Sequence, residues 1–397
     1  MSLPQPDADA LEASRELERR IGASIDAAGG WIGFDEFMRR ALYEPGLGYY
    51  TGPLRRFGRA GDFVTAPELS PLFARALAVQ VAQWFDHCAP VVVEFGAGSG
   101  ALAAELLASL QARGALPREY LIVEVSAPLR EAHQRAIGAR VPALLPRVRW
   151  LDALPGSIDG VVLGNELLDA MPVTVFECTA GSVLACGVAR SGVGGLAWAT
   201  RPASAALADA VRSTLAGADG LGPRPARYRS ELGLQARAWV ATVGRAIERG
   251  ALLLLDYGFP AREYYHPQRA EGTLVAHYRH RVHGDVLRWP GLQDLSAHVD
   301  FTAIAAAAGQ AGLQLLGYTS QARLLLNCGL LELLAQEAGG DASAPRSADD
   351  VRRLGAVQAL ISEAEMGELV KAIAFGRGLP DDAIGFGRGD RREALAC

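Results

Sequence analysis

The feature that most constrains the fold of this chain is an apolar run that leads directly into three closely spaced glycines. Val91-Val-Val-Glu-Phe95 is typical of a short buried strand, Gly96-Ala-Gly-Ser-Gly100 follows it, and residues 101–112 have the composition of a helix. Glycines at such a junction let the backbone approach a ligand, and the first N–H groups of the helix are free to bind it. The sequence therefore predicts a strand, loop and helix that bind a ligand at one end of a sheet.

The same alternation of strand and helix continues along the chain. Further strands are predicted at 120–124, 148–150, 160–164 and 251–256, with helices between them. Short apolar runs separated by helices are typical of a parallel sheet that is covered on both faces. The predicted fold class is therefore α/β.

The pattern divides the chain into four regions. Residues 1–85 are predicted to form a helical N-terminal cap that contributes to the active site, and residues 86–320 the core. The core contains an insertion at about 173–250 and a pocket segment at about 258–300. Residues 321–375 are predicted to be helical, and the glycine- and arginine-rich residues 376–397 to form a flexible tail.

Composition excludes several classes of partner. The net charge is −5, so no basic field attracts nucleic acid or an anionic membrane. Residues 301–322 carry no charge but few large apolar side chains, which favours a buried helix followed by a strand over a membrane span. The N-terminus lacks the apolar region of a signal peptide, and the five cysteines are scattered without a CxxC pair. We expect a soluble, cytoplasmic protein.

Acidic residues follow three successive predicted strands. Glu94 lies two residues before the first glycine, Glu124 ends the second strand, and Asp152 follows the third. The loop also fits the fingerprint of dinucleotide-binding proteins, because Ala101 can replace the third glycine of that fingerprint. Dinucleotide-binding proteins also have an acidic residue at the position of Glu124, so Glu124 does not distinguish the two ligands.

Glu94 distinguishes the two ligands, because it would repel a pyrophosphate. S-adenosylmethionine carries a cationic sulfonium and ammonium and no phosphate, so it suits this run of acceptors. S-adenosylmethionine is therefore the predicted cofactor, and the residues predicted to bind it are Glu94, Gly96, Ala97, Gly98, Gly100, Glu124, Asp152 and Asn165.

The fourth predicted strand ends in a second polar cluster. Asn165, Glu166 and Asp169 would lie at the carboxyl end of the sheet, where open α/β sheets bind their ligands. The alternative is a helix start, with Asn165 as the N-cap and Asp169 on its solvent face. Asp256 ends the fifth strand, where it either borders the pocket or simply ends the strand.

Three histidines, His277, His280 and His283, lie close together in the pocket segment. Arginines interleave them and no cysteine is near, so a structural or substrate-contacting role is favoured over zinc, and no metal site is predicted.

The chain resembles the MidA family of S-adenosylmethionine-dependent methyltransferases, whose mitochondrial members assemble respiratory complex I and dimethylate an arginine. The resemblance spans roughly residues 30–375. Ala97 stands where that family often has proline, and Leu167-Leu168 where it has a more aromatic pair. The segments that carry it are 61–68 (GDFVTAPE), 94–100 (EFGAGSG), 124–126 (EVS), 165–172 (NELLDAMP), 256–258 (DYG), 272–274 (GTL), 294–301 (DLSAHVDF) and 365–368 (EMGE).

The resemblance implies a class I (Rossmann-like) methyltransferase fold. Its sheet would have seven mostly parallel strands, with the antiparallel one near Leu313–Tyr318, a helical cap and a large insertion. It also implies methyl transfer to an arginine of a protein substrate, possibly a respiratory-complex subunit, and Glu166, Asp169 and Glu68 are the predicted catalytic carboxylates. Two alternatives stay open: a methyltransferase for another acceptor, and an assembly factor that binds the cofactor without catalysis.

Overall fold

A computed structural model describes residues 3–52, 65–179, 181–192, 194–218, 222–338 and 348–396. Its main sheet has seven strands along one path, and a short eighth strand, β14 (Val299–Asp300), pairs with the end of β10. The order across the sheet is β15 (Gln314–Ser320), β16 (Val370–Arg377), β10 (Ile247–Phe259), β5 (Ile158–Asn165), β2 (Val91–Phe95), β3 (Glu119–Val123) and β4 (Val148–Leu151). The predicted mostly parallel α/β sheet is confirmed.

The direction of two strands differs from the prediction. β16 runs antiparallel to both neighbours, β10 and β15, so β15 is parallel to the rest of the sheet. The expectation that the antiparallel strand lies near Leu313–Tyr318 is therefore wrong. A local pattern identifies a strand, but its direction depends on where the intervening helices return the chain to the sheet.

Both faces of the main sheet are buried. On β10, Leu253 and Leu255 face one apolar core, and Leu252 and Leu254 face the other. Alternate side chains of a strand point to opposite faces, so burial on both sides produces the continuous apolar run seen in the sequence. The first core contains α4 (Pro71–Phe85) and α5 (Ala101–Ala112), with α6 (Ala127–Arg140) and η1 (Pro142–Arg147) beyond; the second contains α8 (Leu234–Ala246) and α10 (Phe301–Gln310).

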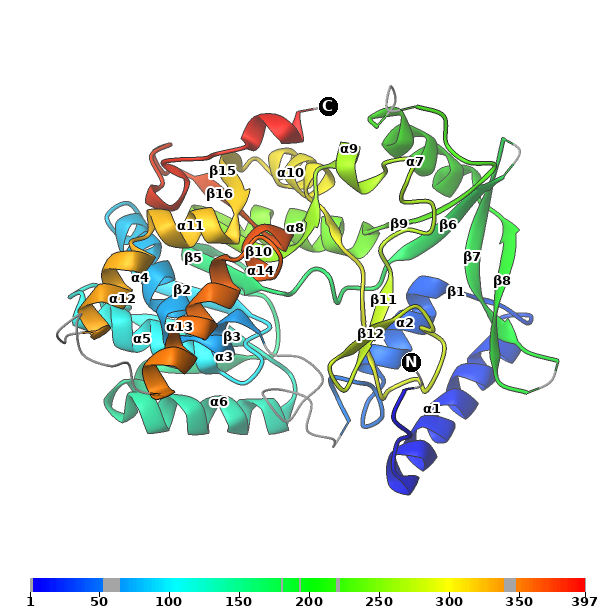
Figure 1. Cartoon of the computed structure of the whole chain (residues 1–397), viewed down its shortest axis with the longest axis horizontal. Helices are drawn as coiled ribbons and strands as arrows, with labels where there is room; N and C mark the ends of the chain where they lie inside the picture. Colours follow the sequence, from blue (N-terminus) through cyan, green and yellow to red (C-terminus); the bar gives the residue numbers. More distant parts are fainter. Residues whose placement is uncertain are drawn as a thin grey trace.

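The N-terminal segment, most of the insertion and the predicted pocket segment together form a second lobe, and no described residue of 258–300 lines the cavity described below (Figure 1). β1 (Ile32–Gly33) pairs with β7 (Ser182–Arg190), and Phe34 shares a core with Val175 and Leu295. The other elements of this lobe are α1 (Ala8–Ala27), α2 (Phe34–Tyr43), β6 (Thr174–Thr179), β8 (Leu196–Pro202), α7 (Ala205–Ala216), β9 (Arg227–Leu232), α9 (Ala261–Tyr264), β11 (Val275–Tyr278), β12 (Arg281–His283) and β13 (Asp294–Ser296).

Two predicted boundaries move. Phe73 and Trp84 of α4 are buried in the core of the main sheet, so the cap lobe ends before α3 (Ala66–Leu69) rather than at residue 85. The predicted helical region 321–375 contains α11 (Gln321–Asn327), α12 (Leu330–Ala338), α13 (Ala348–Ile361) and α14 (Met366–Leu369), but it runs on into β16.

The predicted flexible tail is instead packed along β15. The Arg391 N–H donates to the Tyr318 carbonyl at 2.6 Å, and Asp390 Oδ1 accepts from the Tyr318 N–H at 3.1 Å. Arg392 donates to the Leu316 carbonyl at 2.8 Å. The tail, which includes η2 (Ile384–Phe386) and η3 (Arg392–Leu395), thus satisfies backbone groups that an edge strand would otherwise leave exposed.

Within the described ranges, the structure contains no helix that is both long enough and apolar enough to cross a bilayer. The uncharged stretch 301–322 forms α10 and β15, as predicted.

Candidate functional site

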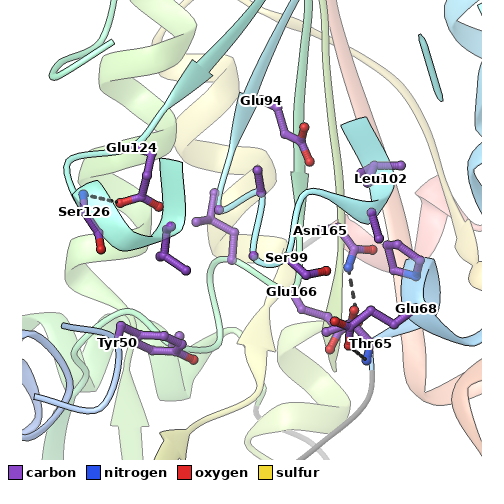
Figure 2. Close-up of a pocket in the computed structure, with 18 of the residues that line it drawn as sticks. Tyr50, Thr65, Glu68, Glu94, Ser99, Leu102, Glu124, Ser126, Asn165 and Glu166 are labelled. Atoms are coloured by element: carbon purple, nitrogen blue, oxygen red, sulfur yellow. Dashed lines mark hydrogen bonds between the residues drawn. The ribbon is translucent and has the colours of Figure 1, made fainter. Parts of the chain in front are cut away.

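A cavity of about 250 Å³ lies at the carboxyl ends of β2, β3 and β5 (Figure 2). The glycine loop and the residues after β3 line it, together with the end of β5, the start of α3 and two tyrosines. The main polar residues that line it are Glu94, Ser99, Glu124, Ser126, Asn165, Glu166, Thr65, Glu68, Tyr43 and Tyr50.

The glycine loop has a backbone that only glycine adopts without strain. Gly96, Gly98 and Gly100 have φ values of 66°, 54° and 82°, in the left-handed region. A Cβ on Gly100 would lie 2.9 Å from the Cα of His133, and one on Gly96 would lie 3.1 Å from Leu167 Cδ1, whereas the space beside Gly98 is open. Gly98 and Ala97 line the cavity, so the loop can approach a ligand there.

Glu94 is buried at the end of β2, as its position predicted. Its Oε2 accepts a 2.6 Å hydrogen bond from the Tyr120 hydroxyl, and burial raises the pKa of Glu94 to about 7. A cationic ligand in the cavity would favour the ionised form of this carboxyl, because its positive charge would stabilise the carboxylate in place of the water that burial removes.

Glu124 also lines the cavity (Figure 2). Its Oε1 accepts from the Ser126 N–H at 2.7 Å, and burial raises the pKa of Glu124. Its position after the second strand suits acceptance from ribose hydroxyls.

Asp152, which is predicted from the sequence to bind the cofactor, does not lie at the cavity. Its side chain is 86% exposed, it pairs with Arg130 Nη2 at 2.5 Å, and it does not line the cavity. β4 is one of the two edge strands of the main sheet, and the bend that follows it turns Asp152 towards solvent. Val125, Ser126 and Leu129 line this end of the cavity instead.

Asn165 and Glu166 occupy the end of β5. Asn165 Nδ2 donates to Glu166 Oε1 at 3.2 Å, while Asn165 Oδ1 is buried and has no hydrogen-bond partner among the described residues. A buried acceptor without a partner is costly, so this atom suits a ligand that donates a hydrogen bond, such as an ammonium.

Glu166 has a left-handed backbone, with a φ of 48°. Its N–H donates to the Leu255 carbonyl at 2.8 Å, and its Oε1 also accepts from the Ala66 N–H at 3.4 Å. Burial and the nearby carboxylate of Asp169 raise the pKa of Glu166 to about 8. A non-glycine residue held in this conformation is typical of a functional site.

The two other predicted catalytic carboxylates lie differently. Glu68, on α3, lines the cavity and accepts from the Thr65 N–H at 3.4 Å, beside the Ala66 N–H that Glu166 accepts from. Asp169 is half-buried and is not a lining residue, and burial raises its pKa to about 7. Residues 166–171 do not form a helix, so the alternative of a helix start at Asn165 is wrong.

Asp256 does not border the cavity but holds the turn that carries Glu166. It is fully buried, and its Oδ2 accepts from the N–H groups of Leu167 at 3.0 Å and Leu168 at 2.7 Å. Its Oδ1 accepts from the Tyr257 N–H at 3.0 Å. The sequence placed an acidic residue at this strand end, but it carried no signal for these partners.

Sequence reasoning missed Tyr43 and Tyr50. Both line the cavity, and their rings stack with centroids 5.5 Å apart. The Tyr43 hydroxyl donates to the Ala170 carbonyl at 3.0 Å, and the Tyr50 hydroxyl donates to Asp294 Oδ1 at 2.9 Å. The sequence feature that could have indicated them is the group of three tyrosines in the turn-rich segment 43–50.

The histidine cluster takes part in hydrogen bonds. His277 Nε2 lies 3.2 Å from Ser296 Oγ, and the Asp285 N–H donates to His283 Nδ1 at 3.2 Å. Across the described ranges, no group of three or more His, Cys, Asp or Glu side chains could hold a metal ion. Residues 61–64 of the segment 61–68 lie outside the described residues.

Comparisons with known proteins indicate the same cofactor. The family described as "Putative S-adenosyl-L-methionine-dependent methyltransferase" matches residues 76–319. A crystal structure of a Burkholderia thailandensis protein bound to S-adenosyl-homocysteine is 49% identical, with a TM-score of 0.91, over 99% of this chain and all of that one.

Curated relatives are more distant. "Protein arginine methyltransferase NDUFAF7, mitochondrial" from Danio rerio is 28% identical over 80% of this chain and 77% of its own. The Mus musculus protein of the same name is 29% identical over 93% of this chain and 85% of its own.

Proposed function

The chain belongs to the family of S-adenosylmethionine-dependent methyltransferases that matches residues 76–319, and from that premise we propose that it methylates a guanidinium nitrogen of an arginine in a protein. The observation that carries the proposal is the convergence of two carboxylates, Glu68 and Glu166, at the end of the cavity away from Glu124 (Figure 2). The relatives that are described as protein arginine methyltransferases support it.

The cofactor is S-adenosylmethionine, which supplies an electrophilic methyl group on a sulfonium. The residues that would hold it are those of the glycine loop with Glu94, Glu124 and Asn165. They fit because the loop leaves open space at Gly98, Asn165 Oδ1 has no donor among the residues that the structure describes, and the two carboxylates are acceptors beside the loop. Their role is to orient the donor rather than to activate it.

The end of the cavity away from Glu124 suits a guanidinium. Glu68 and Glu166 accept from neighbouring N–H groups at the start of α3, so their carboxylates face a common space. Carboxylates bind guanidinium bidentately and draw its charge away from one nitrogen, which leaves the nitrogen more nucleophilic. Asp169 adds negative charge from behind the cavity wall.

Transfer to a guanidinium nitrogen releases one proton, and Glu166 is placed to accept it. Because the pKa of Glu166 is raised to about 8, its carboxylate is a better base than an ordinary glutamate. Tyr43 and Tyr50 narrow the cavity, and hydrogen bonds from both hydroxyls hold their rings in place. This wall would limit the entry of water beside the acceptor.

A respiratory-complex subunit remains our predicted protein substrate, and a cytoplasmic location remains a prediction. Support for the substrate comes from the resemblance to the MidA family. The relatives are described as mitochondrial, so location is tested separately by fractionating cells and locating the chain with an antibody.

The experiment labels a lysate with radioactive S-adenosylmethionine. The lysate comes from a strain that lacks this protein, and the purified wild type or a variant is added. We expect the wild type to label a protein band whose peptides contain methylarginine by mass spectrometry. Glu166→Gln should lose most of this label, whereas Glu131→Gln, which removes an exposed carboxylate on α6, should keep it. Label on another residue type or only on small molecules would overturn the proposal.

A further inference from the structure

A buried histidine joins the glycine loop to the edge of the sheet. His133 of α6 is 0% exposed, and its Nε2 lies 3.0 Å from the carbonyl oxygen of Gly98. Its Nδ1 accepts a 3.3 Å hydrogen bond from Nε1 of Trp150, on β4. The indole N–H can only donate, so Nδ1 must be the unprotonated nitrogen. Nε2 therefore carries the hydrogen and donates it to Gly98.

The same residue contacts the loop through its backbone. A Cβ on Gly100 would lie 2.9 Å from the Cα of His133 and 3.2 Å from its Cδ2. The loop therefore contacts α6 at two residues, Gly98 and Gly100. Such support matters because glycines have the largest backbone freedom, and three of them have left-handed φ values here.

We propose that His133 is a positioning residue for the methyl donor: through its hydrogen bond to Gly98 it holds the glycine loop in the shape that binds S-adenosylmethionine. It does not line the cavity, so it acts on the cofactor through the backbone of the loop. Trp150 donates to His133 and His133 donates to Gly98; we call this pair of hydrogen bonds the relay. Trp150 belongs to it because its N–H selects the tautomer of His133 that can donate to Gly98.

The relay works only while the imidazole is neutral. A second proton, on Nδ1, would point towards the N–H of Trp150, and two donors cannot form a hydrogen bond with each other. Burial lowers the pKa of His133, and Arg130 on the same helix acts in the same direction. The other charged groups around this part of α6 are Asp152, which pairs with Arg130, the Glu105–Arg140 pair between α5 and α6, and Glu94 and Glu124 beside the loop.

The sign of the pH effect follows. Because burial lowers the pKa of His133, its ring is still mostly neutral at the usual histidine pKa of about 6.5, and protonation at a lower pH weakens the loop. Cofactor affinity of the wild type should therefore fall only at a pH clearly below about 6.5. The nearby carboxyls titrate too, so a variant that changes only His133 is needed to isolate its contribution.

The test measures the Kd for S-adenosylhomocysteine by calorimetry in the full chain, at about pH 7.5 and at successively lower pH values down to the lowest at which the wild type stays folded. His133→Gln can reproduce the relay, because its amide N–H₂ can donate to Gly98 while its oxygen accepts from Trp150. We expect it to bind within about threefold of the wild type at the highest pH and to lose less affinity on acidification. His133→Leu keeps the bulk without the hydrogen bonds and should raise the Kd at least about tenfold.

Three results would overturn the proposal. These are wild-type affinity in His133→Leu, an equal loss in His133→Gln and His133→Leu, or the same pH dependence in His133→Gln as in the wild type. If His133→Leu does not fold, Trp150→Phe replaces it. That change removes the opposing N–H, so the Kd should rise less on acidification than in the wild type, and an equal or steeper rise contradicts the relay.

Discussion

Replacing Glu166 by glutamine should reduce methyl transfer and at the same time stabilise the ligand-free protein. The substitution keeps the size of the side chain and its hydrogen bonds to Asn165 and Ala66 remain possible, but the charge is lost. Two effects of that charge can be worked out separately, one on the acceptor and one on folding.

The effect on the acceptor is the loss of a charge-assisted hydrogen bond. Hydrogen bonds to charged groups contribute about 1.5–3 kcal/mol, so kcat/KM should fall roughly 10- to 150-fold. Affinity for S-adenosylhomocysteine should change by less than about twofold, because the donor is held mainly by the glycine loop and its neighbours.

The effect on folding has the opposite sign. Burial and Asp169 raise the pKa of Glu166 from 4.5 to about 8, so the folded state binds a proton that the unfolded state has released. Stability from this group is therefore lost as pH rises from 4.5 through about 8, the reverse of a salt-bridged carboxylate. The cost could reach about 5 kcal/mol in a dry site, and water in the cavity reduces our expectation to about 1–2 kcal/mol.

Urea unfolding at about pH 6 and about pH 9 measures the effect on the free energy of unfolding. Single-turnover methyl transfer with the same preparations measures the effect on the acceptor. The wild-type kcat/KM should rise with pH up to about 8, and the variant should lack that rise. Equal loss of cofactor binding and transfer would place Glu166 on the donor side. A variant that is less stable than the wild type at high pH would refute the burial argument.

Four further changes test other parts of the site and fold. Gly98→Val should abolish S-adenosylhomocysteine binding, because a β-branched residue resists a φ of 54°, whereas Gly138→Ala, in open space on α6, should bind normally in the same calorimetric titration. Glu124→Ala should weaken that binding by about 1–3 kcal/mol without changing the melting temperature, if this carboxylate accepts from the ribose. Asp256→Ala leaves one buried and two partly buried N–H groups without their acceptor and should lower the free energy of unfolding by about 2–4 kcal/mol; an unchanged urea midpoint would contradict its role. Deleting residues 388–396 should cost about 1–3 kcal/mol, seen as a lower melting temperature, because Tyr318 and Leu316 lose their partners.

Much of the core and of the donor side could be predicted because their signals are local. The run 91–95 and the helix 101–112 have the bounds expected of them, since apolar content and period depend on neighbouring residues. Glu94, Gly98 and Glu124 line the cavity because parallel strands end at the same edge, wherever the rest of the chain goes.

The failures share a different cause, because each depends on residues that are distant in sequence. The Tyr50 hydroxyl is held beside the cavity by a hydrogen bond to Asp294, and Asp256 accepts a hydrogen bond from the N–H of Leu168. Asp152 has the same strand-end position as Glu124, yet it faces solvent because its strand is at the edge of the sheet.

The sequence by itself determined the α/β class, the glycine loop and the acidic residues at the strand ends, because these follow from periodicity and from the chemistry of single positions. Only the tertiary structure decided that Glu68 and Glu166 share one space, that the tail covers β15, and that His133 supports Gly98. Such contacts depend on how helices and strands pack, and packing is a property of the whole chain rather than of any segment.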